Sequence, residues 1–301
     1  MEKNERNPDW KPQKERIKEI TDQLEAGIKE LFESNKFKEY LKCMSKFHHY
    51  SLNNTLLIAS QKPDATLVAS YTSWREDHDR SVRKGEKGIK IIAPTKYKVE
   101  VKDEETGETT TVQRLGFKVA YVFDVSQTEG EDLPAIAVPE LTGSPENCDK
   151  LWKALNKICP VPICFEDTGN AKGYYNDAEK YIAIKNDISE LQAVKTLIHE
   201  MAHQMLHSKE NQDPDHPVDR NAMEVEAESV AYTVCQKYGL DTSEYSFGYI
   251  AGWSSGKEVT ELRNSLERIR QTADTLITDL DKELDPRSRT AHHRADHDNE
   301  R

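Results

Sequence analysis

Residues 196–207 read TLIHEMAHQMLH, and this stretch decides how the rest of the chain is interpreted. It contains the pattern H-E-x-x-H, with His199 and His203 four residues apart. Side chains at this spacing lie about 40° apart around a helix, so both imidazoles can bind one metal ion. Glu200 lies about 100° away from His199 and is placed to face a water molecule at that ion. The pattern is typical of zinc sites that hydrolyse peptide bonds, with Glu200 as the catalytic base.

A single helix over residues 189–207 is predicted to carry this motif. Ser189 and Gln192 have the spacing of a capping box at its start, and apolar residues recur along one face. The alternative is an amphipathic helix whose histidines only face solvent. We disfavour it because a predicted strand precedes the helix and candidates for a third metal ligand follow it.

Three glutamates on the next predicted helix, residues 222–238, are candidates for the third ligand that zinc requires. The buried face of that helix is expected at Ala227, Val230, Ala231 and Val234. Glu224 lies nearest to the centre of this face, so we predict that it is the ligand. Glu228, one turn further on, is predicted to support the ligands, and Glu226 to be a solvated surface charge. His207 continues the i+4 series but is turned further round its helix, which makes it a weaker candidate.

The expected fold class is α+β, in two domains. The first domain is predicted to be a helical and antiparallel-sheet module that ends in a β-hairpin. Its elements are helices within 13–47 and at 52–59, β-prone segments at 65–70 and 88–93, and hairpin strands at 96–102 and 109–123 around a turn at 103–108.

A proline-rich segment, residues 133–145 (LPAIAVPELTGSP), is predicted to separate the domains, because no helix or strand can run through it. A helix at 147–158 and strands at 163–165, 172–175 and 181–184 are expected to follow. The predicted organisation is a first module at 10–130, a linker at 131–146, a zincin-like domain at 147–255, a helix at 256–284 and a disordered tail at 285–301.

The C-terminal helix carries apolar residues at alternating spacings of three and four. They are Val259, Leu262, Leu266, Ile269, Ala273, Leu276 and Leu280. Packing of this seam on the helix's own domain is the interpretation we favour, and self-association is the alternative.

The net charge of the 301 residues is −12, but it is unevenly distributed. The first 100 residues contain 20 basic and 16 acidic side chains, whereas the remainder contains 22 basic and 38 acidic ones. A basic module that can meet a polyanion is therefore joined to an acidic one. No apolar run approaches the roughly 18 residues of a membrane helix, the N-terminus is not signal-like, and five scattered cysteines argue against a disulfide framework. We expect a cytoplasmic protein without membrane contact.

Three segments of the second half resemble a known family. GYYNDAEKYIAI, TLIHEMAHQMLH and MEVEAESVAY are similar to the zincin-type metallopeptidase domain of ImmA/IrrE-like and ArdC-like proteins. In those families an E-x-x-A follows the H-E-x-x-H, and residues 224–227 match it. The resemblance implies a zinc ion, or another divalent metal, held by His199, His203 and Glu224, with Glu200 as general base.

The first half resembles the same source. SLNNTLLIASQKPDATLVASYTSW, VRKGEKGIKIIAP and VFDVSQTEG are similar to the N-terminal single-stranded-DNA-binding domain of ArdC-type antirestriction proteins, which are carried by conjugative plasmids and integrative elements. The resemblance implies that single-stranded DNA is a partner.

Basic and aromatic residues near a glycine turn are the candidates for contacts with DNA. Between residues 35 and 99 there are 13 basic and 6 acidic side chains. Cations neutralise phosphates and aromatic rings stack on unpaired bases. The candidate residues are Tyr71, Trp74, Arg83, Lys84, Lys87 and Lys90. The alternative is that the two aromatic residues belong to the core and the cations to a solvated turn.

The function expected from these patterns is that of a single-stranded-DNA-binding antirestriction protein of a mobile element, with a zinc metallopeptidase-like domain. One alternative is a metallopeptidase that cleaves a repressor or regulator of the element, with the DNA module only localising it. Another is a DNA-binding protein whose metal site is structural. A protein substrate or a restriction nuclease would be a further partner.

Overall fold

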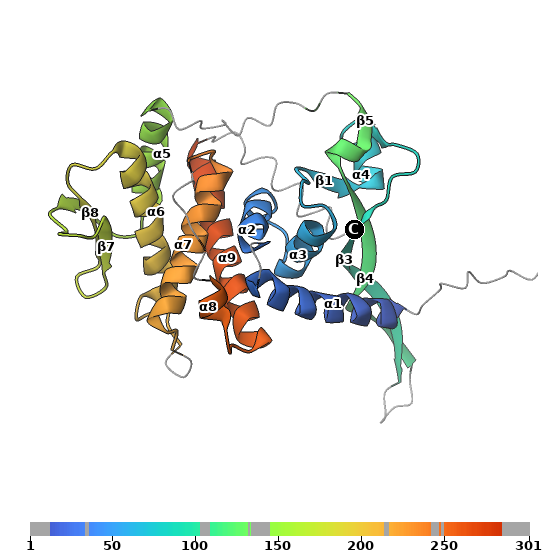
Figure 1. Ribbon diagram of the computed structural model, residues 1–301. Coiled ribbons are helices and arrows are strands. Elements are labelled where there is room, and N and C mark those ends of the chain that lie inside the picture. Colours follow the sequence, from blue (N-terminus) through green and yellow to red (C-terminus); the bar gives the residue numbers. More distant parts are fainter. Residues whose placement is uncertain are drawn as a thin grey trace, which may run out of the picture.

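The computed structural model describes residues 13–33, 36–102, 109–131, 133, 145–213, 217–241, 247 and 250–284 (Figure 1). The first half contains α1 (Gln13–Glu33), α2 (Lys36–Lys46), α3 (Leu52–Gln61), β1 (Val68–Ser70), α4 (Tyr71–Glu76), β2 (Arg80–Val82), β3 (Ile89–Lys102), β4 (Thr109–Asp124), the 3-10 turn η1 (Val125–Gln127) and β5 (Thr128–Gly130). The second half contains α5 (Pro145–Ile158), β6 (Ile163–Glu166), β7 (Gly173–Asn176), β8 (Tyr181–Lys185), α6 (Glu190–His207), α7 (Arg220–Lys237), α8 (Ile250–Ser254) and α9 (Val259–Leu284). The predicted mixed class of helices and sheets is confirmed.

The hairpin is the main feature of the first sheet, in which the strands follow the order β1-β4-β3 and pair antiparallel. Its register runs from Ile89 opposite Val122 to Lys102 opposite Thr109, so the predicted hairpin is confirmed, while its turn, 103–108, lies outside the described residues. The segment 88–93 is not a separate strand but the beginning of β3. Pro94 interrupts the sequence pattern there, yet the strand continues through it, because β3 lies at the edge of the sheet, where a missing N–H is tolerated.

Asp124, at the end of β4, fixes the corner of this sheet. Its side chain is 1% exposed and accepts hydrogen bonds from three backbone N–H groups, those of Thr66 (2.7 Å), Leu67 (3.1 Å) and Ser126 (3.0 Å). Burial alone would raise the pKa of this carboxyl, but the hydrogen bonds outweigh burial and lower it below 3.8.

We expect Asp124→Asn to lower the free energy of unfolding by about 2–4 kcal/mol at pH 7, because an amide cannot accept all three hydrogen bonds. A carboxylate with a lowered pKa stabilises the fold above pH 3.8 and loses this contribution as the pH falls through its folded-state value. The difference between the parent and the variant should therefore narrow below that pH. Urea denaturation between pH 7 and pH 3 measures it, with Asp64→Asn, an exposed residue, as the control. If the parent and Asp124→Asn had the same free energy of unfolding at pH 7, the stabilising role of the Asp124 carboxylate would be contradicted.

In the second half, α6 packs against a mixed sheet of order β6-β8-β7, and α7 packs against α6. The helix predicted over 189–207 is confirmed as α6, with Ser189 as its N-cap and the Ser189 hydroxyl accepting the Gln192 N–H at 3.2 Å. The helix predicted over 222–238 is α7, which begins two residues earlier because Asp219 caps it. No helix in the described part of the chain is long and apolar enough to cross a bilayer.

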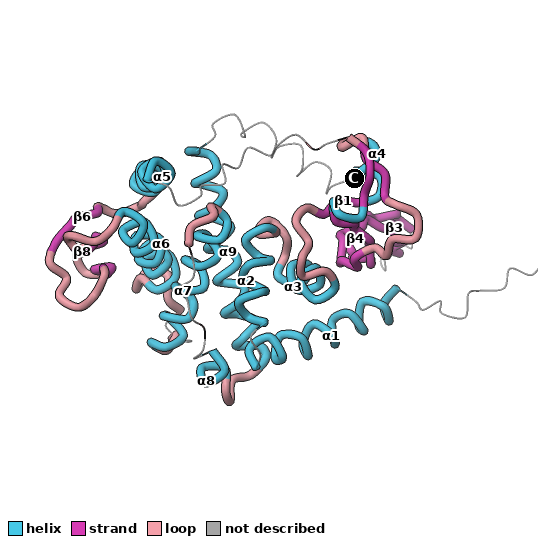
Figure 2. The backbone as a smooth tube through the Cα atoms, turned by 45° about the horizontal axis from the view of Figure 1, so that its top comes forward, coloured by secondary structure: helices cyan, strands magenta, loops and turns pink. Residues whose placement is uncertain are grey.

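One buried cluster of the hydrophobic core includes residues from both halves of the chain. Ile28 and Leu41 from α1 and α2 belong to the same buried cluster as Val230 from α7 and Leu266 from α9. Figures 1 and 2 both place α2 between α3 and the pair α7–α9. Segment 131–146 is described only at residues 131, 133 and from the start of α5 onward, and the predicted tail, 285–301, lies outside the described residues.

The apolar seam of α9 lies inside this core. Its residues from Leu262 to Leu280 are 0–2% exposed and pack on the chain's own helices. Polar contacts add to the packing: the Nδ1 atoms of His48 and His49 approach Asp274 Oδ1 at 2.8 and 3.1 Å. The seam therefore packs within the chain and is covered there, so it offers no surface for self-association.

Candidate functional site

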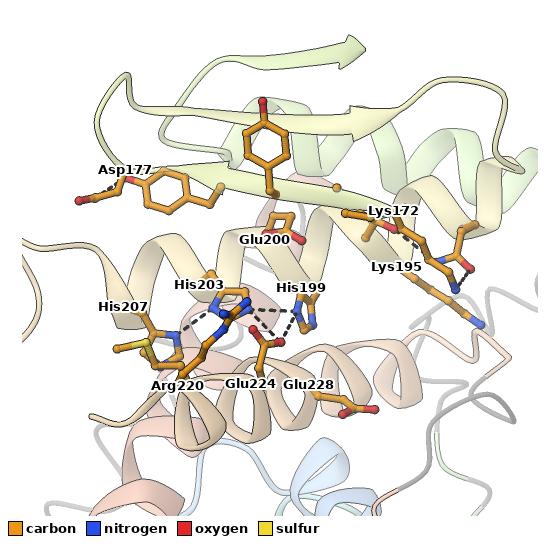
Figure 3. Close-up of a pocket in the computed structure, with 17 residues that line it drawn as sticks. Lys172, Asp177, Lys195, His199, Glu200, His203, His207, Arg220, Glu224 and Glu228 are labelled. Atoms are coloured by element: carbon orange, nitrogen blue, oxygen red, sulfur yellow. Dashed lines mark hydrogen bonds and ion pairs between the residues drawn. The ribbon is translucent and has the colours of Figure 1, made fainter. Parts of the chain in front are cut away.

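α6, α7 and β7 surround a cavity of about 930 Å³ that contains all of the residues of the predicted metal site (Figure 3). α6 contributes His199, Glu200 and His203, and α7 contributes Glu224 and Glu228. The short residues Ala227 and Ala231, both fully buried, allow the two helices to approach closely.

Three ligand atoms converge within this cavity. His199 Nε2 and His203 Nε2 lie 3.1 Å apart, and Glu224 Oε2 lies 3.6 Å from each of them. Ligand distances of about 2.0–2.2 Å around a tetrahedral ion would place the ligand atoms about 3.3 Å from one another. Two imidazoles and one carboxylate at this separation fit a divalent metal ion, with a coordination position open toward the cavity.

The charges of this cluster are mutually stabilising. Hydrogen bonds from His199 and His203 lower the pKa of Glu224 far below its usual range. Burial acts to lower the pKa of His199, but the carboxylates of Glu224, Glu200 and Glu228 outweigh it and raise that pKa. Three carboxylates around two imidazoles thus create a negative site that favours a cation.

Glu200 is placed apart from the three ligand atoms, on the side of α6 that faces β7. It is 7% exposed, and burial raises its pKa, an effect that the imidazoles of His199 and His203 and the backbone of Tyr175 partly oppose. The close approach of β7 depends on Gly173. A Cβ atom there would lie 2.5 Å from Thr196 Cγ2 and 2.7 Å from the Ala183 carbonyl oxygen.

Glu226 is fully buried, and the prediction that it is a solvated surface charge is wrong. Its carboxylate accepts hydrogen bonds from the Arg268 guanidinium and from the Ser265 hydroxyl at 2.7 Å. It also lies 3.2 Å from His207 Nε2. These partners on α9 and α6 offset the cost of burying the charge. The spacing of residues along α7 does not reveal that α9 covers the side of the helix on which Glu226 lies.

His207 connects Glu226 to the candidate ligand His203, since the Nδ1 atoms of the two histidines lie 3.1 Å apart. When His203 offers its Nε2 lone pair to a metal ion, its Nδ1 must carry the proton and donate to His207 Nδ1. The remaining proton of neutral His207 is then on Nε2 and is donated to Glu226. The low rank of His207 as a ligand agrees with this position, because its Nδ1 faces His203 and its Nε2 faces Glu226.

Glu228 lines the cavity one turn beyond Glu224 but lies outside the group of converging ligand atoms. Burial, together with the nearby charge of Glu224, raises its pKa to about 6 despite the opposing effect of His199. Its predicted role in supporting the ligands stays a prediction.

The predicted DNA contacts are not equally available. Trp74 is 0% exposed and donates its indole N–H to the Phe123 carbonyl at 2.7 Å, so the prediction that it stacks on bases is corrected: it is a core residue. The Arg83 guanidinium contacts Glu86 at 3.0 Å and the carbonyls of Ser126 and Thr128. Tyr71 is 55% exposed. Lys84, Lys87 and Lys90 are also exposed.

In comparisons with known proteins, the first half of the chain, with the candidate DNA contacts, and the second half, with the candidate metal site, match two different families. Residues 11–123 match the family of the N-terminal domain of anti-restriction factor ArdC. Residues 158–239 match the family of the IrrE N-terminal-like domain, and this range includes His199, Glu200, His203 and Glu224.

Individual relatives were also found. An uncharacterized protein of Bacillus anthracis is 31% identical over 312 residues and covers 90% of this chain, which itself spans about half (52%) of that relative's length. Crystal structures of the antirestriction ArdC protein from plasmid R388, metal-free and Mn(II)-bound, are 24% and 21% identical, each with a TM-score of 0.47 and coverage of 78% of this chain and 85% of theirs. The chain therefore combines a region similar to the N-terminal domain of anti-restriction factor ArdC with a region similar to the IrrE N-terminal-like domain, in the order expected from the sequence.

Proposed function

We propose that this chain is a cytoplasmic antirestriction protein of a mobile element, of the kind that conjugative plasmids carry. In this proposal its first half binds single-stranded DNA and its second half is a zinc metallopeptidase-like centre. The observation that carries the proposal is the convergence of His199, His203 and Glu224 beside Glu200 in one cavity of a chain whose first half matches the ArdC N-terminal domain.

The residues of the metal centre have separate roles in this proposal. His199, His203 and Glu224 would hold one zinc ion, or another divalent ion, and a bound ion would supply Lewis acidity for attack on a carbonyl group. Glu200 would take a proton from the attacking water at its carboxylate and return it to the leaving group. Its burial supports this role, because a carboxylate with a raised pKa is a stronger base.

A metallopeptidase that acts on a regulator of the element is the second candidate. The cavity favours it because β7 is the edge strand of its sheet and Gly173, Tyr174 and Tyr175 line the cavity. An extended peptide could pair with the free side of this strand and pass across Glu200. In this case the DNA module would only localise the enzyme.

Metal analysis tests the centre directly. We expect the purified parent to hold one divalent ion per chain, and His203→Ala and Glu224→Ala to lose most of it and to unfold at lower temperature than the metal-bound parent. Glu129→Ala, an exposed glutamate on β5, is the control. A Glu224→Ala variant with a full complement of metal would exclude Glu224 as a ligand.

A further inference from the structure

The β3–β4 hairpin, whose far end projects beyond α1 (Figure 1), exposes four large apolar side chains. Tyr97, Leu115, Phe117 and Tyr121 are 47%, 65%, 56% and 45% exposed. Only two other large apolar side chains in the described part of the chain are comparably exposed, Tyr71 and Phe165. Solvent-exposed aromatic and aliphatic residues gathered on one element indicate a binding surface.

The strand register shows which of these residues lie together. Lys90 lies opposite Tyr121, Pro94 opposite Phe117, and Lys96 opposite Leu115. Residues directly opposite one another project on the same side of an antiparallel pair, and alternate residues along a strand share a face. These six residues therefore occupy one side of the hairpin, which we call the hairpin face. Tyr97, opposite Arg114, projects on the other side.

The exposed charges that the structure describes on the two hairpin strands are all positive. The described exposed charged side chains of β3 and β4 are Lys90, Lys96, Lys98, Arg114 and Lys118, and the one described carboxylate on these strands is that of the buried Asp124. From α1, the Arg16 guanidinium donates to the Tyr121 hydroxyl at 3.2 Å and adds a cation at the border of the hairpin face. In the sequence, Glu100 and the acidic segment 103–108 separate the cations of β3 from those of β4.

We propose that the hairpin face is the surface on which this protein binds single-stranded nucleic acid, with Phe117 and Tyr121 stacking on bases and Lys90 and Lys96 contacting phosphates. This inference rests on the proposed function and assigns its DNA site to residues that the motif analysis, except for Lys90, did not select. A strand surface that alternates aromatic rings with cations suits unpaired bases, whose faces are free to stack. The glycine turn suits it less, because Trp74 is buried and Arg83 is bound to neighbouring carbonyls and a carboxylate.

Fluorescence anisotropy with a labelled oligodeoxythymidine of about 20 nucleotides tests the proposal on the full chain, since known single-strand sites cover roughly 4–16 nucleotides. Phe117→Ala should weaken binding about 5- to 150-fold. Lys96→Ala should reduce the slope of log affinity against log salt by about 0.7. All of the substituted residues are exposed, and thermal unfolding and metal content should match those of the parent.

Two matched variants make the result specific. Tyr97→Ala removes an exposed ring from the opposite side of the same hairpin, and Lys84→Ala with Lys87→Ala removes the cations of the glycine turn; both should bind nearly as the parent does. A parent that fails to bind the oligonucleotide overturns the proposed function. A parent that binds, together with a Phe117→Ala variant of equal affinity, overturns the hairpin face alone. If Phe117→Ala instead changes the mass measured by light scattering with DNA affinity unchanged, the face belongs to a second copy of the chain.

Discussion

If the proposed metal centre is a peptidase, Glu200→Gln is expected to remove nearly all of its peptide hydrolysis while leaving the bound metal in place. The amide keeps the size of the side chain but cannot accept a proton from water. Loss of a general base costs about 10²–10⁴-fold in rate. Hydrolysis of a quenched fluorescent peptide library measures the loss, and metal analysis of the same preparation serves as the internal control.

The same variant separates the two candidate functions. If antirestriction depends on DNA binding alone, Glu200→Gln should protect DNA in a restriction assay as well as the parent does. If it depends on cleavage of a protein, protection should disappear together with hydrolysis. A Glu200→Gln protein that has lost its metal would make Glu200 a ligand and would contradict the roles assigned along α6.

His207→Leu is expected to weaken metal binding roughly 10- to 100-fold, the usual cost of removing a partner that orients a ligating histidine. The Nδ1–H of His203 would lose its acceptor, so the orientation of its ring and the position of its proton would no longer be fixed. Glu226 would keep Arg268 and Ser265, so the fold should survive. Competition with a fluorescent chelator measures the affinity.

His207→Gln provides the matched control for this prediction. A glutamine can accept a hydrogen bond from His203 through its carbonyl and donate one to Glu226 through its amide, so most of the affinity should be retained. A role of His207 in packing alone would make Gln at least as harmful as Leu, because Gln buries a polar group. Unchanged metal affinity in His207→Leu would contradict the proposed chain from His203 to Glu226.

Features that depend on residues close together in the sequence are the ones that the sequence predicts correctly. The helix α6, its cap and the metal triad depend on spacings within one or two helices, and the structure brings His199, His203 and Glu224 together as the spacing predicted. Glu226 was misjudged because its partner Arg268 lies 42 residues away in the sequence.

Two further differences between the predicted and the observed features also come from contacts between residues that are distant in the sequence. From its position beside a basic turn, Trp74 is predicted to be an exposed aromatic residue. Its actual environment is formed by β4, where its hydrogen-bond partner Phe123 lies 49 residues away in the sequence. The exposed row of the hairpin face could not be identified either, because helices cover part of the hairpin and leave the rest open. The position of α1 decides which part of the hairpin is covered. The alternation of polar and apolar residues along β3 and β4 does not specify that position.

The shared core has a thermodynamic consequence for the two ends of the molecule. α1, α2 and α3 contribute buried side chains to the same cluster as α7 and α9. The hairpin residues Ile89, Ile91 and Val122 belong to a second cluster, to which α2 and α3 also contribute, so the packing of the hairpin end and that of the metal end are linked through these two helices. A ligand that binds only the folded state raises the free energy of unfolding of everything that unfolds with its site. An ion held between α6 and α7 therefore protects the distant hairpin against unfolding, and a nucleic acid held on the hairpin protects the metal cavity, without either end changing its shape.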